Sequence, residues 1–173
     1  MNDTQQPLAR PLFHITEVPP AQAPMDLLLQ ADPSEAKVRA YLAHCRCFVL
    51  SAAGVVTGAC AVQQTRPGVH ELMSIAVRET QQKTGAGTAL LRWLIDTLRQ
   101  SGARQLEVGT GTFGFQLAFY QKQGFRVSAI DHDFFLRHYD TPLYENGIQH
   151  KDMLRLTLNL APAAADGIIG DQT

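Results

Sequence analysis

The chain has 173 residues, of which 45% are hydrophobic and 18% charged, and its formal net charge is −1. This composition is typical of a soluble single-domain protein, and the near-neutral charge gives no reason to expect nucleic acid or a membrane surface as a partner. No apolar run approaches the roughly 20 residues that cross a bilayer, and the polar N-terminus lacks a signal peptide's apolar core, so we expect a cytoplasmic protein.

The N-terminal part predicts a tail followed by strands and short helices. Residues 1–10 are expected to be a disordered tail. We then expect a strand at residues 13–18 and two helices at 24–30 and 33–44. A hairpin of two strands follows at 47–51 and 55–64. We expect Asp32 to cap the second helix, with Pro33 at its first position.

The central stretch predicts a strand, a loop and a long helix, at residues 70–77, 82–88 and 89–100. The strand alternates and is rich in apolar residues. The helix carries an apolar stripe formed by Leu90, Leu91, Leu94, Ile95 and Leu98. The loop between them contains two glycines, which allow several backbone N–H groups to point at one place beside the helix N-terminus. We therefore interpret the loop as a phosphate-binding site, although no Gly-Lys-Ser/Thr of a nucleotide-hydrolase P-loop follows.

Gln82, Gly85 and Gly87 of this loop match the motif Gln/Arg-x-x-Gly-x-Gly/Ala. With the preceding Ile-Ala-Val strand and the leucine-rich helix, the stretch resembles the acyl-CoA loop of the GCN5-related N-acetyltransferases (GNAT). The resemblance implies binding of acetyl-CoA. Its pyrophosphate would meet the loop N–H groups and its pantetheine arm would pair with the strand, at Ile75, Ala76, Val77, Gln82, Lys83, Thr84, Gly85, Ala86, Gly87 and Thr88.

The C-terminal part predicts strands at residues 105–108, 125–130 and 153–160, a helix at 115–123 and a disordered tail at 162–173. The order of elements resembles the GNAT fold. We therefore expect one α/β (α+β) domain over residues 11–161. Its central sheet would be mixed and mostly antiparallel, flanked by helices, with a V-shaped splay between two strands.

A second glycine motif offers a different interpretation. Gly109, Gly111 and Gly114 form a Gly-x-Gly-x-x-Gly between a strand and a helix, as in enzymes that bind dinucleotides or S-adenosylmethionine. However, too few β-α units follow, the next helix is short, and the first hundred residues would have no role. We favour a role for these glycines in opening the V-shaped cleft.

Tyr120 and Glu71 are the candidate catalytic residues. Tyr120 lies in Tyr-x-x-x-Gly-Phe, which resembles the family motif whose tyrosine protonates the departing thiolate, and a phenol with an ordinary pKa near 10 is protonated at pH 7. Glu71 begins the central strand, where several family members have a glutamate that takes the amine proton; it is alternatively a substrate-binding carboxylate. The family often has a CoA-contacting asparagine ahead of the tyrosine; here we expect either that Gln116 takes its place or that the contact is absent.

The segment from Asp131 to Ile148 is longer than a hairpin needs and mixes aromatic with acidic residues. Such a segment can form a lid over an amine-bearing small molecule. Alternatively, it is a packed surface loop or a contact in a homodimer. Neither this segment nor His44, Cys45 and Cys47 has the spacing of a metal motif, so no metal is expected. The sequence thus predicts an acetyl-CoA-dependent N-acetyltransferase acting on a small amine; an acyl-CoA-binding regulatory domain is the alternative.

Overall fold

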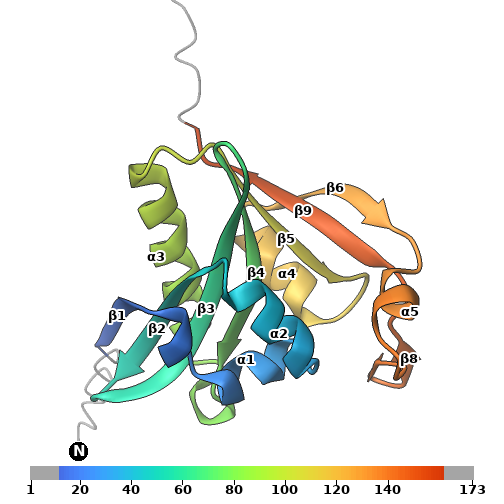
Figure 1. Cartoon of the computed structure of the whole chain (residues 1–173), viewed down its shortest axis with the longest axis horizontal. Helices are drawn as coiled ribbons and strands as arrows, with labels where there is room; N and C mark the ends of the chain where they lie inside the picture. Colours follow the sequence, from blue (N-terminus) through green and yellow to red (C-terminus); the bar gives the residue numbers. More distant parts are fainter. Residues whose placement is uncertain (1–11, 162–173) are drawn as a thin grey trace, which may run out of the picture.

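A computed structural model describes residues 12–161, so both predicted tails lie outside the described residues. The described chain forms a seven-stranded mixed sheet in the order β1-β2-β3-β4-β5-β9-β6, in which only β4 and β5 run parallel (Figure 1). The strands are β1 (Phe13–Val18), β2 (Arg46–Ala52), β3 (Val55–Arg66), β4 (Val69–Val77), β5 (Gln105–Gly111), β6 (Arg126–Asp131) and β9 (Met153–Asn159). The predicted fold class is confirmed.

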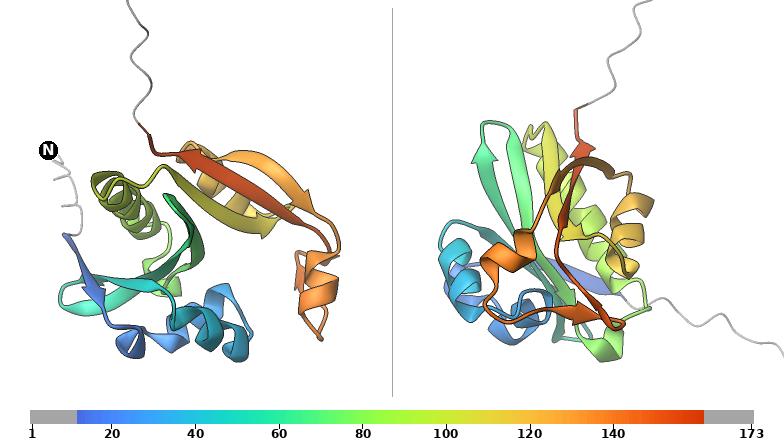
Figure 2. Two further views of the ribbon diagram at one scale, coloured as in Figure 1. Left: turned by 45° about the horizontal axis from the view of Figure 1, so that its top comes forward. Right: turned by 90° about the vertical axis from the view of Figure 1, so that its right-hand side faces the viewer.

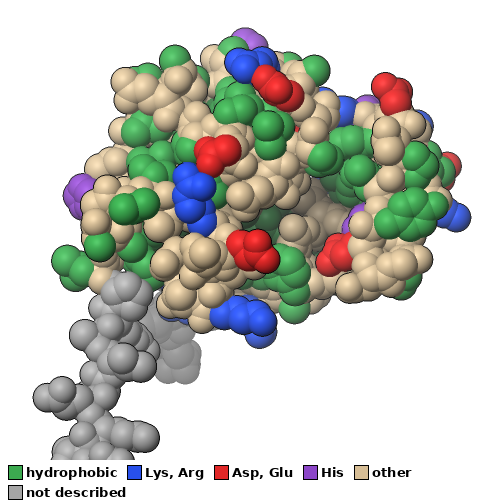
Figure 3. Space-filling model, turned by 90° about the horizontal axis from the view of Figure 1, so that it is seen from below, with side chains coloured by type: hydrophobic (Ala, Val, Ile, Leu, Met, Phe, Trp, Pro, Cys, Tyr) green, Lys and Arg blue, Asp and Glu red, His purple; other side chains and the backbone are tan. Residues whose placement is uncertain are grey.

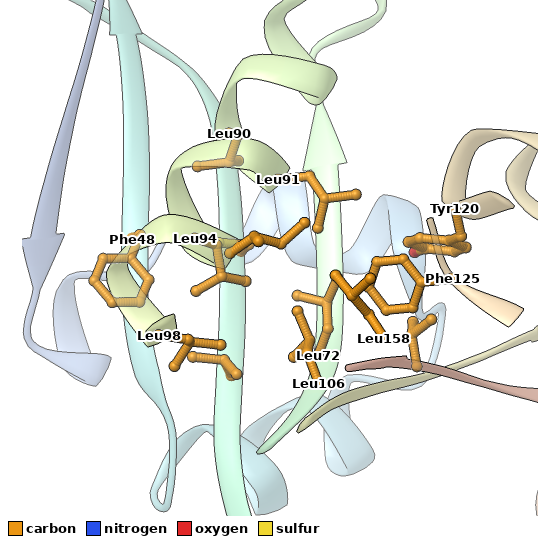
Figure 4. Packing of buried hydrophobic residues seen from close by; sticks show 14 of the residues in the cluster. Phe48, Leu72, Leu90, Leu91, Leu94, Leu98, Leu106, Tyr120, Phe125 and Leu158 are labelled. Atoms are coloured by element: carbon orange, nitrogen blue, oxygen red, sulfur yellow. The ribbon is translucent and has the colours of Figure 1, made fainter. Parts of the chain in front are cut away.

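Helices cover both faces of the sheet. They are α1 (Met25–Ala31), α2 (Glu35–Leu42), α3 (Ala86–Gln100) and α4 (Phe115–Lys122), with short 3₁₀ turns η1 (Pro20–Gln22) and η2 (Glu79–Gln81). Alternate residues of β2 and β3 supply two separate cores, because successive side chains of a strand point to opposite faces. Phe48 and Leu50 pack under α3, whereas Cys47 and Val49 pack against α1 and α2. The helix stripe of Leu90, Leu91, Leu94 and Leu98 is fully buried in the first core (Figure 4).

The sheet separates between β4 and β5. Their parallel pairing covers only Val69 to Leu72 of β4 and Gln105 to Val108 of β5. Beyond these residues β4 stays with β3, while β5 turns away with β9 and β6, so that the two parts of the sheet diverge (Figure 2). A bulge marks the same place, since Ala61 pairs with Ser74 and Val62 with Leu72, leaving Met73 as the extra residue. The predicted splay is therefore present, and it begins at the bulge.

The three glycines of the Gly-x-Gly-x-x-Gly motif lie against side chains from near the C-terminus. A methyl group on Gly111 would lie 2.6 Å from the ring of His150, and one on Gly114 would lie 2.7 Å from the Glu145 carboxylate. A methyl group on Gly109 would collide with the sulfur of Met153. Protein side chains thus fill the space that a nucleotide at this motif would need, which argues against the dinucleotide interpretation.

The segment between β6 and β9 is folded rather than an open loop. It contains α5 (Phe134–His138) and a small hairpin of β7 (Tyr144–Glu145) and β8 (Ile148–Gln149). We call residues 131–150 the insertion. In Figure 1 it projects at the right-hand side, beyond the diverging end of the sheet. None of the described helices has both the length and the apolar character that crossing a membrane requires.

Several predicted element ends were wrong for identifiable physical reasons. The cap of α2 is Ser34, whose hydroxyl accepts from the N–H of Lys37, because Asp32 instead accepts from the N–H of Ser34. Helix α3 begins at Ala86, three residues before the expected Ala89, because Gly85 caps the helix and Gly87 is already part of it. Strand β5 continues through Gly109 to Gly111, where pairing with β9 outweighs the weak strand preference of glycine.

We predict that Gly111→Ala lowers the free energy of unfolding by about 1–3 kcal/mol, because the added methyl group forces the buried ring of His150 to move. Urea unfolding at neutral pH measures this change. Gly58→Ala is the matched control in strand β3. Its methyl group would find neighbours no closer than 3.5 Å, so it should cost much less. Equal losses in the two variants would show that residue 111 does not require close packing.

Candidate active site

Two neighbouring cavities contain most of the residues predicted to be functional. The larger, which we call the groove, has a volume of about 700 Å³ and lies between the end of β4, the loop before α3, and α4. The smaller, which we call the pocket, has a volume of about 500 Å³ and lies between β4, β5, α2 and the insertion. Ala31 and Gln116 line both cavities, so the two adjoin.

The loop before α3 closes one end of the groove. Gly85 caps α3 with φ of +92°, a left-handed conformation that suits glycine, and Lys83 also has a positive φ of +62°. The first backbone N–H bonded back into the helix is that of Ala89, which donates to the Gly85 carbonyl, so the N–H groups just ahead have no intrahelical acceptor. These N–H groups and the helix dipole create a site for an anion.

Gln82 lines the groove, but both its main chain and its side chain donate hydrogen bonds within the protein. The N–H of Gln82 donates to the carbonyl of Glu79, and its side chain donates to the carbonyl of Val77. Gln82 therefore fixes the loop against β4, and the N–H groups available to an anion begin after it. Of the other predicted loop residues, Lys83, Gly85, Gly87 and Thr88 line the groove, whereas Thr84 and Ala86 do not.

The exposed edge of β4 forms the floor of the groove. Ile75, Ala76 and Val77, the residues of β4 predicted to bind the donor, all line the groove. Pairing with β5 ends at Leu72, so this part of β4 has no strand partner on that side among the described residues. An extended amide chain can therefore bind here as an additional strand, with its groups hydrogen bonded to the main chain of β4.

Tyr120 lies at the inner wall of the groove. Helix α4 presents it next to Phe125, with ring centroids 5.6 Å apart, and Figure 4 shows both rings beside the leucines of the core. Only 7% of Tyr120 is exposed. Burial raises the pKa of Tyr120 well above the ordinary value, because the ionised phenolate would lose its hydration. A phenol held protonated in this way can donate a proton but is a poor base.

Glu71 lies in the pocket, on the other side of the sheet from Tyr120. Its Oε1 accepts a hydrogen bond of 2.7 Å from Nη1 of Arg155, and its side chain is 22% exposed. Arg155 comes from β9 and lies 4.0 Å from the Asp131 carboxylate. The structure thus places the two candidate catalytic residues in adjoining cavities, and it supplies a cation beside Glu71.

The insertion forms the outer wall of the pocket and is tied to the beginning of the fold. The hydroxyl of Tyr139 donates to Oδ1 of Asp32, a distance of 3.1 Å across 107 positions of sequence. His150 stacks on Phe113, with ring centroids 4.4 Å apart, and its Nε2 lies 3.1 Å from Glu145. In Figure 3 a hollow separates the main body from the insertion.

Sequence reasoning missed several residues of the pocket. Arg155 occupies a regular polar position of the alternating strand β9, so the pattern did not distinguish it from Thr157 or Asn159. Lys37 and Tyr41 project into the pocket from α2, four positions apart. No signal in the sequence linked them to β9, because their proximity depends on the tertiary fold. Residues 12–161 contain no group of three or more His, Cys, Asp or Glu side chains arranged to hold a metal ion.

Comparisons with known proteins agree with this geometry. A sequence model of the acetyltransferase (GNAT) family matches residues 13–125. The uncharacterized N-acetyltransferase YvbK of Bacillus subtilis (strain 168) is 48% identical over 136 residues, which cover 78% of this chain and 88% of that protein.

Two solved structures of similar proteins contain CoA or acetyl-CoA. A Bacillus subtilis acetyltransferase in complex with CoA is 42% identical with a TM-score of 0.81, and the match covers 87% of this chain and 100% of that one. A GNAT family acetyltransferase from Elizabethkingia anophelis with acetyl-CoA bound is 33% identical with a TM-score of 0.81, covering 85% and 97%.

The buried tyrosines predict how stability depends on pH. Burial raises the pKa of Tyr41 to about 12, and the pKa values of Tyr120 and Tyr139 are also raised. Above pH 10 the unfolded chain loses phenolic protons that the folded chain retains, so the free energy of unfolding falls as pH rises. In urea unfolding between pH 9 and 11, Tyr120→Phe should lose stability less steeply than the wild type. Parallel curves would mean that Tyr120 ionises at its ordinary pKa when folded.

Proposed function

The chain belongs to the acetyltransferase (GNAT) family, and from this premise we propose that it transfers the acetyl group of acetyl-CoA to the primary amine of a small molecule, by direct attack in a ternary complex. The observation that carries the proposal is that the groove and the pocket adjoin where β4 leaves β5. A donor in the groove and an acceptor in the pocket can then meet without a covalent enzyme intermediate.

The groove suits acetyl-CoA by three independent features. The N–H groups before Ala89 suit the pyrophosphate, and the unpaired edge of β4 suits the amide groups of the pantetheine arm. The volume of about 700 Å³ accommodates an extended ligand. The B. subtilis and E. anophelis proteins, which share the fold over almost their whole length, are described with CoA and acetyl-CoA respectively.

The two candidate catalytic residues divide the proton transfers. As the amine nitrogen bonds to the thioester carbon, Glu71 accepts the proton that the nitrogen loses, directly or through a water molecule. As the carbon–sulfur bond breaks, Tyr120 donates its phenolic proton to the departing sulfur. The products are an N-acetyl amide and the free thiol, and the phenol is restored from solvent. The raised pKa of Tyr120 keeps the donor protonated over the physiological range.

Arg155 orients Glu71 for this role. It bonds Oε1 of Glu71, whereas Oε2 accepts no hydrogen bond from the described residues. One carboxylate oxygen is thus fixed and the other is available to an amine or a water molecule. In the alternative role, the same oxygen binds the substrate as an ammonium ion.

The pocket supports a small acceptor rather than a protein. Its volume is about 500 Å³, and the insertion encloses its outer side through the Tyr139–Asp32 hydrogen bond. A peptide chain would need an open channel past this contact.

The proposal is tested with the purified full-length chain in two assays. Calorimetric titration with acetyl-CoA, S-adenosylmethionine and NADH should show one-to-one binding of acetyl-CoA alone. Thiol release with a panel of small primary amines should then show turnover. Binding of acetyl-CoA without turnover on any amine would favour the regulatory-domain alternative, and binding of NADH or S-adenosylmethionine in its place would overturn the proposal.

We predict that Tyr120→Phe lowers kcat roughly 100-fold while leaving the Kd for acetyl-CoA within about twofold, because the variant removes only the proton donor. Steady-state kinetics and calorimetry measure the two quantities. Gly85→Glu is the contrasting variant. It places a carboxylate at the anion site and forces a side chain into a left-handed conformation, so it should abolish acetyl-CoA binding. A Tyr120→Phe enzyme with normal kcat would exclude the phenol as acid.

We predict that Glu71→Gln lowers kcat roughly 100-fold and removes the fall of kcat at low pH. If Glu71 is the base, the wild-type rate falls at low pH as the carboxylate takes up a proton, and this fall is absent from the glutamine variant. The measurement is kcat against pH with saturating amine. A variant that keeps the low-pH fall and shows mainly a raised KM would assign Glu71 to substrate binding.

A further inference from the structure

Charged side chains in the pocket are paired with one exception. Glu71 bonds Arg155 at 2.7 Å and Glu145 lies 3.1 Å from His150. The remaining carboxylate of the pocket, Asp32, accepts both the hydroxyl of Tyr139 and the N–H of Ser34. The cation left over is Lys37, which has no carboxylate within 4.0 Å in the part of the chain that the structure describes.

Lys37 is held at the pocket wall rather than extended into solvent. Its Nζ lies 4.7 Å from the centroid of the Tyr139 ring, and Asp32 fixes that ring through the hydroxyl. The lysine is half-buried and lies on the side of α2 that lines the pocket opposite the insertion. Arg39, two positions further on, points to solvent and bonds Glu35. The helix therefore presents one cation to the pocket and another to the outside.

One hydroxyl group of the pocket also has no partner. Oγ1 of Thr110 is buried and makes no hydrogen bond within residues 12–161, whereas the buried Oη of Tyr41 lies beside Ser74. A buried hydroxyl without a hydrogen-bond partner is destabilising, so a ligand that accepts a hydrogen bond here is favoured. Tyr41 lies one helical turn after Lys37 and also lines the pocket, so Lys37 is the cation that α2 offers to an anion there.

Apolar side chains make up much of the remaining wall of the pocket. Phe134, Phe135 and Leu143 of the insertion line the pocket beside Tyr139. The three features together describe the complement of one molecule: an amine toward Glu71, an apolar body against the insertion, and an anionic group at Lys37.

We propose that the acceptor is an amine that also carries a carboxylate, of the size of an aromatic amino acid, and that Lys37 selects it by binding the carboxylate. This inference rests on the proposed function and narrows its substrate class. Lys37 contacts Tyr139 and pairs with neither Glu71 nor Tyr120 among the described residues, so it contributes to binding of the acceptor and not to the proton transfers.

The test compares matched amines that differ in the carboxylate: phenylalanine with phenethylamine, and tyrosine with tyramine. The wild type should have the higher kcat/KM for each amino acid. Lys37→Met should lower kcat/KM for the amino acids about 10- to 100-fold, mainly through KM, and change it less than threefold for the two amines that lack the carboxylate. Arg39→Gln removes a cation from the exposed side of the same helix and should leave all four values unchanged.

A binding measurement separates this inference from the proposed function. With CoA present, calorimetry should show tighter binding of N-acetylphenylalanine than of N-acetylphenethylamine, and Lys37→Met should remove the difference. This readout does not depend on turnover, so it remains informative if no amine is acetylated and the proposed function fails. A wild type that turns over and binds the compounds without a carboxylate better, or a Lys37→Met variant that weakens both classes equally, would overturn the role of Lys37.

Discussion

The separation of β4 from β5 is the constraint on which the rest of the structure depends. Two parallel strands that paired along their whole length would leave no free edge and no passage between the faces of the sheet. Here the pairing stops at Leu72, and the bulge at Met73 turns the remainder of β4 away. The free edge becomes the floor of the groove, and the diverging strand β5 carries the wall of the pocket. One local irregularity thus creates both cavities and the junction between them.

Much of this could be predicted from sequence because the signals were local. The loop from Gln82 to Thr88 is recognisable from its glycines and the helix that follows, and Tyr120 from the residues just after it. The boundaries were less accurate, because Asp32 and Ser34 compete for the same helix end and sequence does not rank them. Pairing across long distances was invisible, so neither Arg155 beside Glu71 nor Tyr139 beside Asp32 was foreseen.

The Gly-x-Gly-x-x-Gly motif shows how one pattern can serve different physical needs. In a dinucleotide fold such glycines allow a phosphate to approach the main chain. In this chain the same absence of side chains allows His150, Met153 and Glu145 to approach it instead. The sequence indicated that some group approaches the main chain closely at these glycines, but it did not indicate which group. Context from the remaining elements, above all the second loop at Gly85, was needed to choose between them.

The hydrogen bond between Tyr139 and Asp32 has an evolutionary consequence. The matched family region ends at residue 125, before the insertion begins, whereas the groove is built entirely from residues before that point. On the proposed function, donor binding uses only residues before 125, whereas the acceptor pocket combines residues of α2 and β4 with residues of the insertion. Changes in the insertion can alter which acceptor fits while the groove is left intact. Such changes need to keep the contacts that join the insertion to the rest of the fold, which include the Tyr139–Asp32 hydrogen bond, the Lys37–Tyr139 contact and the His150–Phe113 stack. New specificities can then arise while the groove residues stay the same.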